Sequence, residues 1–179
     1  VSALADYLKD HGLQAYFIAA VDSVSWLLNL RAKDLPETPV IRAFALVDEM
    51  RHVWVFSDHL DMQKLSVKLT ILPLSELPAR LRKFKKQNLG LDYEITSVAI
   101  MEFLQNAHIN VVRTVDFCQQ QKSIKNSCEL QGMRDAHLCD GVAVCKFLCW
   151  LDQNWSGKTE LDIVNKLHDF RSKQQNFVE

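Results

Sequence analysis

The chain has 179 residues, of which 48% are hydrophobic and 24% are charged, and its formal net charge at pH 7 is −1. This is the composition of a globular protein with a buried core, and it excludes a strong overall attraction to nucleic acid or to an acidic membrane. The apolar runs are far shorter than the roughly 20 residues of a membrane-spanning helix, and the N-terminus shows no signal-peptide pattern. We therefore expect a globular chain with no nucleic-acid or membrane partner.

The first 60 residues predict helices alternating with strands. Ser2 is a candidate N-cap for a first helix that ends just before Gly12, and Asp22 is a candidate N-cap for a second helix. Residues 48–50 predict a tight turn between two strands. The strands of this part are expected at 15–20, 40–47 and 51–56.

The next part of the chain, up to Asp116, continues this alternation. A helix is expected from about Ser75 to Lys86, and Ser97 is a candidate cap for another. Strands are expected at 68–74, 91–96 and 109–115. Alternating elements indicate an α/β structure, so we expect a mixed sheet of five or six strands flanked by helices over residues 1–116.

The last 60 or so residues lack strand patterns and predict two helices. Asn126 with Glu129, and Thr159 with Asp162, have the spacing of helix N-terminal caps. Apolar or small residues recur behind these caps at intervals of three and four, and two such helices cannot bury those stripes on each other alone. We expect the stripes to stay partly exposed, as at the beginning of a second domain. The stripes consist of Leu130, Met133, His137, Gly141, Val144, Leu148 and Leu151, and of Leu161, Val164, Leu167 and Phe170.

The five cysteines all lie in the last third of the chain, without a CxxC motif. Their odd number argues against a disulfide framework, so we expect free thiols, a reducing compartment and a cytoplasmic protein. His137, Cys145 and Cys149 are the best candidates for a metal site. One helix offers two or three ligands on one face, whereas zinc takes about four. Because cysteine behaves as a small apolar residue, we expect burial of these thiols, and His137 as a hydrogen-bonded core residue.

Other candidate sites are weak. No segment matches a phosphate-binding loop, a nucleophile elbow, a zinc-protease helix or a calcium-binding loop. The carboxylates Asp92, Glu94 and Glu102 are scattered and predict no dinuclear metal site. The basic run at 80–86 contains one aromatic residue, Phe84, so a solvated helix face is favoured over a nucleic-acid surface.

Two stretches together resemble one family. "DSVSWLLNLRAKDLPETPV" (22–40) is similar to a signature of the three-domain aminopeptidases P, and "IKNSCELQGMRDAHLCDGVAVCKFLCWL" (124–151) resembles that family's entry into its catalytic domain. The closing "TELDIVNKLHDFRSKQQNFVE" (159–179) is similar to the family's next segment. The chain is thus identified as a member of the aminopeptidase P family, within the pita-bread metallopeptidases.

The resemblance implies a fold and an activity. It implies a creatinase/prolidase N-terminal-like domain over residues 1–116, then a linker and the first helices of an incomplete pita-bread catalytic domain over 117–179. The parent protein would release the N-terminal residue of peptides with proline second, using two divalent metal ions, typically manganese. The family's ligands, two Asp, one His and two Glu, match no position here. We therefore expect no catalytic residue and no metal site in this chain, and no activity of the chain by itself.

The resemblance also implies partners and a site. The partners would be the remainder of the polypeptide, the peptide substrate and further copies in a homo-oligomer. The resemblance places the stretch 22–40 near the catalytic mouth, with Arg31 and Asp34 facing the substrate entrance. An Arg31–Asp34 ion pair that merely holds the loop is an equally open interpretation. Ala32 stands where the family usually has Gly, which would strain a backbone of positive φ.

Two other functions remain open from the sequence. One is an interaction module from a catalytically dead relative, which binds peptides or histones. The other is a relative that acts on dipeptides or on creatine, which the match of 22–40 disfavours. Metal-ligand residues beyond Glu179 would favour the enzyme, and their loss would favour the interaction module.

Overall fold

The chain forms two compact units, Val1–Ser123 and Ile124–Glu179. The computed structural model describes residues 1–33, 35–60, 70–175, 177 and 178. No helix that it describes is both long and apolar enough to cross a membrane. The short helix at residues 117–123 belongs to the first unit, and the assignment of residues 117–179 to the start of a catalytic domain stays a prediction.

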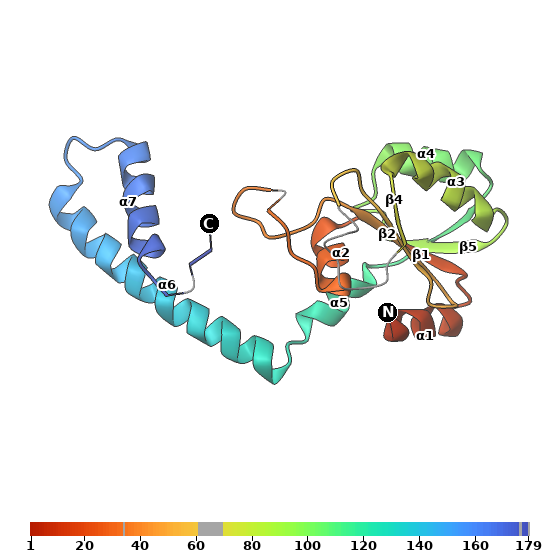
Figure 1. The fold of residues 1–179 in the computed structure, drawn as a ribbon, viewed down its shortest axis with the longest axis horizontal. Helices are drawn as coiled ribbons and strands as arrows, with labels where there is room; N and C mark the ends of the chain where they lie inside the picture. Colours follow the sequence, from red (N-terminus) through yellow and green to blue (C-terminus); the bar gives the residue numbers. More distant parts are fainter. Residues whose placement is uncertain (34, 61–69, 176, 179) are drawn as a thin grey trace. The chain divides into compact units, whose positions relative to one another are not determined.

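The first unit contains a mixed six-stranded sheet in the order β4-β3-β2-β1-β5-β6 (Figure 1). Strand β2 pairs antiparallel with β1 on one side and with β3 on the other. The other three pairings are parallel: β5 pairs with β1, β6 with β5, and β4 with β3. The predicted mixed α/β sheet is therefore confirmed. The strands are β1 Ala15–Ile18, β2 Phe44–Asp48, β3 Val53–Phe56, β4 Thr70–Leu72, β5 Asn88–Leu91 and β6 Asn110–Arg113.

Helices cover both faces of this sheet (Figure 1). One face packs against α1 Ser2–Asp10, α2 Val21–Leu28 and α5 Phe117–Ser123, and the other against α3 Leu77–Leu81 and α4 Val98–Asn106. Short 3-10 turns, η2 Leu74–Glu76 and η3 Arg82–Phe84, flank α3. Successive side chains of a strand point to opposite faces, so Tyr16 and Ile18 of β1 enter the first core, and Ala15 and Phe17 enter the second.

Several predicted boundaries are wrong in detail. Residues 91–96 do not form a strand beyond Leu91, because the Asp92 carboxylate accepts a hydrogen bond from the Glu94 N–H at 2.9 Å and turns the chain. Such Asp turns compete with strand pairing. The expected helix over 75–86 is broken into η2, α3 and η3. Of the strand expected at 68–74, residues 68 and 69 lie outside the described part.

Two predicted helix caps are also wrong. Val1, not Ser2, is the N-cap of α1, and Ala20, not Asp22, is the N-cap of α2. Asp22 lies in the first turn of α2, where its carboxylate binds the Lys122 ammonium group of α5. The carboxylate thus links α2 to another helix.

The second unit is a helical hairpin of α6 Ser127–Asn154 and α7 Glu160–Ser172, with α7 folded back along α6 (Figure 1). Both predicted capping boxes are present, Asn126 with Glu129 and Thr159 with Asp162. No strand occurs in the described residues after Arg113. The Arg171 guanidinium group joins the helices by donating from Nε to Asp140 Oδ1 at 2.7 Å.

The apolar stripes of this hairpin are partly exposed, as predicted. Only Ala143 and Phe147 are buried among the described side chains of α6, and none is buried in α7. Leu148 is 55% exposed and Leu161 is 73% exposed. Two helices cover one side of each other and leave the remaining apolar positions to water.

Gly90 of β5 is the position where the sheet tolerates no side chain. A Cβ atom there would lie 2.8 Å from Cδ2 of Tyr16 and 2.9 Å from Cδ1 of Leu13. Both neighbours are 1% exposed, so neither has room to move. A glycine at this point lets the Tyr16 ring lie directly on the neighbouring strand.

We expect Gly90→Ala to lower the free energy of unfolding by about 1–3 kcal/mol, because an added methyl group overpacks the core. Gly141→Ala is the matched control. Its Cβ meets nothing within 4 Å, and alanine in a helix interior is more stable than glycine by about 0.5–1 kcal/mol. Urea unfolding followed by circular dichroism measures both, and a Gly90→Ala chain as stable as the unsubstituted one would contradict the packing argument.

Candidate functional site

The candidate site is the entrance loop, which we define as residues 29–41, the segment that follows α2 and is described except for Asp34. Asn29 ends α2 in the left-handed conformation with φ 51°, and its N–H donates to the Trp26 carbonyl at 3.1 Å. Asparagine tolerates this conformation better than most side chains. The turn directs the chain away from the helix at the point where the loop begins.

Ser25 of α2 binds both ends of the entrance loop. Its side-chain oxygen donates to the Val21 carbonyl at 2.7 Å and accepts a hydrogen bond from the Ile41 N–H at 2.9 Å. Its carbonyl accepts from the Leu30 N–H at 3.0 Å and from Arg31 Nη1 at 3.1 Å. Ser25 is 2% exposed, so one buried residue binds both ends of the loop.

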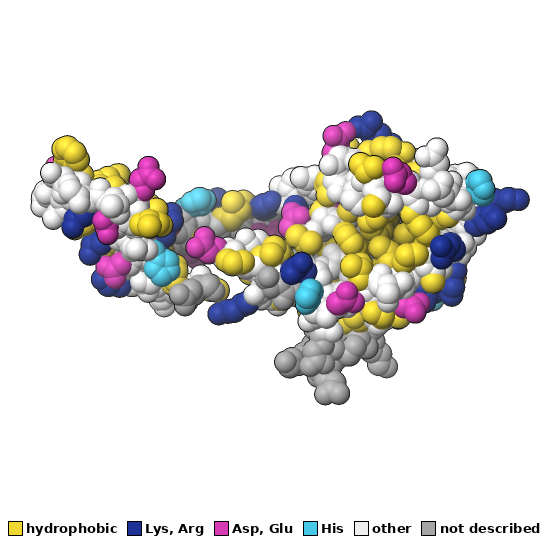
Figure 2. Space-filling view, turned by 90° about the horizontal axis from the view of Figure 1, so that it is seen from above, with side chains coloured by type: hydrophobic (Ala, Val, Ile, Leu, Met, Phe, Trp, Pro, Cys, Tyr) yellow, Lys and Arg dark blue, Asp and Glu magenta, His cyan; other side chains and the backbone are white. Residues whose placement is uncertain are grey.

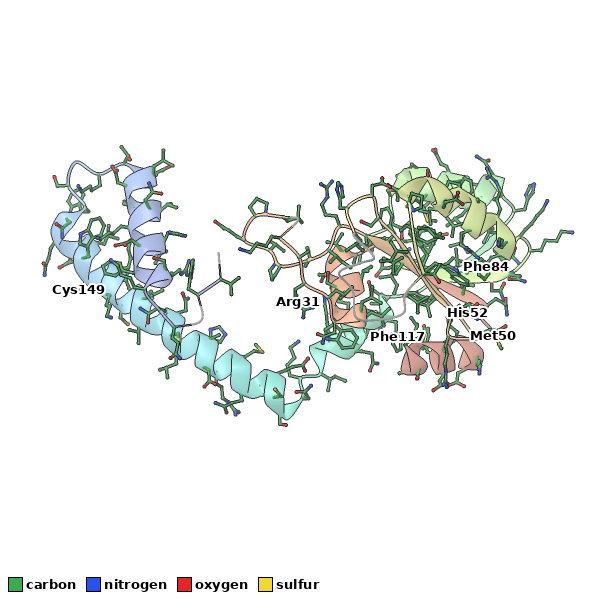
Figure 3. The ribbon with its side chains drawn as sticks, in the orientation of Figure 1. Arg31, Met50, His52, Phe84, Phe117 and Cys149 are labelled. Carbon is green, nitrogen blue, oxygen red and sulfur yellow. The ribbon has the colours of Figure 1, made fainter. Side chains whose placement is uncertain are left out.

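Arg31 lies at the C-terminal end of α2 with an exposed side chain (Figure 3). Its Nη1 also donates to the Leu30 carbonyl, at 2.9 Å. A cation is favourable at the C-terminal end of a helix, where carbonyl groups lack partners. The backbone therefore holds one corner of the guanidinium group, and a carboxylate would meet the edge formed by Nε and Nη2. The predicted partner Asp34 lies outside the described residues, so both interpretations of the pair stay predictions.

Apolar residues anchor the start of the entrance loop. Trp26, Leu27 and Leu30 are partly buried against the core cluster that contains Tyr16 and Val24. Ala32 packs on the same cluster. Among the described non-glycine residues, positive φ occurs at Asn29, Glu37, Arg51, Lys86 and His108, and Ala32 is not one of them. The strain considered for alanine at this position therefore does not arise.

A cavity of about 250 Å³ lies where the entrance loop meets the ends of β2 and β3. Its rim is braced by Ser57, whose hydroxyl donates to the Arg42 carbonyl at 2.7 Å and accepts from the His59 N–H at 3.2 Å. Its apolar walls and polar rim suit an apolar side chain of a peptide. Sequence reasoning missed it because its walls come from segments far apart in the chain. The described lining residues are Val21, Leu35, Arg42, Ala43, Phe44, Phe56, Ser57, Asp58, His59 and Leu74.

The cysteine- and histidine-bearing helix α6 does not form a metal site in the part of the chain that the structure describes. His137, Cys145 and Cys149 are exposed there, so the prediction that they are buried is wrong for this chain. The reason is that α7 covers one side of α6 only. No group of three or more His, Cys, Asp or Glu among the described residues comes together to hold a metal ion. The residues present therefore do not fit the dinuclear metal centre that the family resemblance implies.

The basic run at 80–86 is held by aromatic contacts. The Arg80 guanidinium lies 4.6 Å from the Trp54 ring centre, and Arg82 lies 5.0 Å from that of Phe103. Phe84 is buried in the core and offers no surface for stacking on a base. On the face seen in Figure 2, Lys and Arg side chains lie at the right-hand edge of the first unit, beside a hydrophobic area. These contacts favour the predicted solvated helix face.

A family profile described as the creatinase/prolidase N-terminal domain matches residues 1–129. The chain belongs to this family. Over 99% of its length it is 30% identical to the Xaa-Pro aminopeptidase app-1 of Caenorhabditis elegans, and over 98% it is 29% identical to the Xaa-Pro aminopeptidase 1 of Dictyostelium discoideum. It covers 31% and 29% of these two proteins, so it spans less than a third of the curated relatives.

Solved structures agree with this assignment. The crystal structure of the X-prolyl aminopeptidase of C. elegans, described as a cytosolic enzyme with a di-nuclear active site, matches with a TM-score of 0.83 and 31% identity. The match covers 98% of this chain and 31% of that one. An Xaa-Pro dipeptidase of Bacillus anthracis shares the fold with a TM-score of 0.72 at 15% identity, over 95% of this chain and 47% of the other. The resemblance to the aminopeptidases P is thus confirmed.

The thiols should differ in reactivity according to burial. Cys128, Cys145 and Cys149 are exposed and Cys139 is half-buried, whereas burial raises the pKa of the Cys118 thiol to about 12. Because the thiolate is the reactive form, we expect a maleimide at pH 8 to label the three exposed thiols first and to leave Cys118 unlabelled. Mass spectrometry of tryptic peptides measures this, and all five should react in urea. Labelling of Cys118 as fast as Cys128 would contradict the described core.

Proposed function

We propose that this chain is the non-catalytic portion of a metalloaminopeptidase that releases the N-terminal residue from peptides with proline second. The observation that carries this proposal is its similarity, in sequence and fold and over nearly its whole length, to the X-prolyl aminopeptidase of C. elegans. The chain by itself is expected to be inactive, because the described residues offer no metal-binding group. The relatives are named as peptidases, which favours the enzyme over an interaction module.

The metal ions of the parent enzyme are part of this proposal. The C. elegans enzyme is described as having a di-nuclear active site, and this supports two divalent ions in the parent. Manganese is the proposed metal, and its ligands would come from residues outside this chain. The parent is proposed to act in the cytoplasm, like the cytosolic C. elegans enzyme.

The entrance loop is the part of this chain proposed to meet the peptide. Arg31 is exposed, and the backbone of Ser25 and Leu30 holds its Nη1, so its position does not depend on a flexible side chain alone. A guanidinium group so held can orient a peptide carboxylate or an acidic neighbour, and Asp34 is proposed to share this role. The partners proposed for the chain are the remainder of its polypeptide, the peptide substrate and further copies in a homo-oligomer.

The first test compares this chain with the full-length polypeptide that contains it. With manganese added, the full-length protein should cleave a peptide with proline second and hold about two metal ions. The 179-residue chain should show neither turnover nor stoichiometric metal. Peptide cleavage followed by mass spectrometry and metal analysis measure both. A full-length protein that binds peptides without cleaving them would overturn the enzyme and favour the interaction module.

The second test removes the guanidinium group from the entrance. In the full-length protein, we expect Arg31→Ala to raise KM about tenfold with little change in kcat, because a hydrogen bond to a charged group contributes about 1.5–3 kcal/mol. Arg51→Ala is the control, since its partner Asp6 lies 3.6 Å away in an exposed ion pair, and such pairs contribute little. Steady-state kinetics with one Xaa-Pro peptide decide the question, and unchanged kinetics for Arg31→Ala would refute the entrance role.

A further inference from the structure

The Tyr16 hydroxyl lies at the point where the chain leaves the sheet of the first unit. Tyr16 belongs to β1 and is 1% exposed. Its hydroxyl donates to the Val115 carbonyl at 3.0 Å, accepts from the Phe117 N–H at 3.2 Å and lies 2.8 Å from Thr114 Oγ1. One buried side chain thereby holds the segment of residues 114–117, which connects β6 to α5.

Two carboxylates hold the same segment from other directions. Asp92, which follows β5, accepts a hydrogen bond from the Asp116 N–H at 2.9 Å. Asp116 is 2% exposed, and its own carboxylate accepts from the Gln119 N–H in the first turn of α5, at 3.0 Å. The start of α5 is therefore bonded to β1, to the turn after β5 and to its own cap.

Helix α5 is in turn bound to α2, which leads into the entrance loop (Figure 3). Phe117 and Cys118 share a core cluster with Val24 of α2 and with the first residues of the loop. Lys122 binds the Asp22 carboxylate. Burial alone would raise the pKa of Asp22, but the hydrogen bond from Lys122 and its charge outweigh this and lower the pKa. The ion pair is therefore formed at neutral pH.

We propose that Tyr16 is a positioning residue, whose hydroxyl makes α5, α2 and the entrance loop one rigid piece. The inference rests on the proposed function, in which Arg31 meets the peptide. Arg31 is bonded to α2, α2 is bonded to α5, and the Tyr16 hydroxyl fixes the segment from which α5 starts. A loosened α5 would let α2 and Arg31 shift together, without touching any catalytic group.

Two features support a positioning role for the Tyr16 side chain. Burial raises the pKa of Tyr16 above its ordinary value of 10.0, so the hydroxyl keeps its proton and donates even in mildly alkaline solution. Gly90 leaves the room in which the ring lies. Tyr16→Phe keeps the ring and removes only the hydroxyl, so it leaves the Val115 carbonyl and the Phe117 N–H without this partner.

Hydrogen exchange on the 179-residue chain is the first arm of the test. We expect the amides of residues 117–123 to exchange about tenfold faster in Tyr16→Phe, while the amides of α4 keep their protection. Leu104→Ala is the control, because Leu104 is fully buried in the core on the opposite face of the sheet. Unchanged exchange of α5 in Tyr16→Phe, or equal loosening of α5 and α4, would overturn the proposal.

Kinetics of the full-length protein are the second arm. We expect Tyr16→Phe to raise KM for an Xaa-Pro peptide about fivefold with kcat and metal content unchanged, and Leu104→Ala to leave KM unchanged. Because the two residues would act through one element, Tyr16→Phe should add no further rise in an Arg31→Ala background. A KM that stays constant although α5 exchanges faster, or effects of the two variants that simply add, would refute the positioning role. An unsubstituted protein without Xaa-Pro activity would refute the proposed function instead, and the exchange arm would still decide whether the hydroxyl clamps α5.

Discussion

The burial of β1 on both faces is the constraint on which the first unit depends. All four of its side chains are buried, and its backbone pairs with β2 on one edge and with β5 on the other. Neither face of this strand reaches water, so its side chains contribute alternately to the two hydrophobic cores on the two faces of the sheet. Tyr16 is the only one of the four with a polar side-chain group, and its hydroxyl has three hydrogen-bond partners. Through this hydroxyl, the buried strand β1 holds the segment of residues 114–117, which lies about a hundred positions further along the chain.

Polar side chains perform the same task in the irregular parts of the unit. A segment outside helices and strands must find partners for its N–H and carbonyl groups, because an unpaired buried group is costly. Ser25 does this for the two ends of the entrance loop, and Asp92 does it for the turn after β5 and for the start of α5. The loop proposed to meet the peptide is therefore attached to a rigid scaffold at both ends, as a recognition loop requires.

The second unit differs from the first in having little buried core. Its two helices are well capped and joined by the Arg171–Asp140 ion pair, yet most of its described large apolar side chains remain exposed. Capping and pairing explain why the helices form, and they do not bury an apolar face. The chain covers less than a third of the longer peptidases that it resembles. The exposed cysteines of α6 belong to the same uncovered surface.

The sequence by itself determined the class of fold, the approximate strands, both capping boxes and the family. These features depend on residues a few positions apart, such as Asn126 with Glu129, or on a continuous signature such as residues 22–40. The tertiary structure alone decided the hydrogen-bond partners of Tyr16, Ser25 and Arg31, and which cysteine is buried. Tyr16 bonds to residues about a hundred positions away, and Ser25 bonds to Ile41 across a loop. Local propensity cannot predict such contacts, because they form only once the sheet and its helices bring distant backbone groups together.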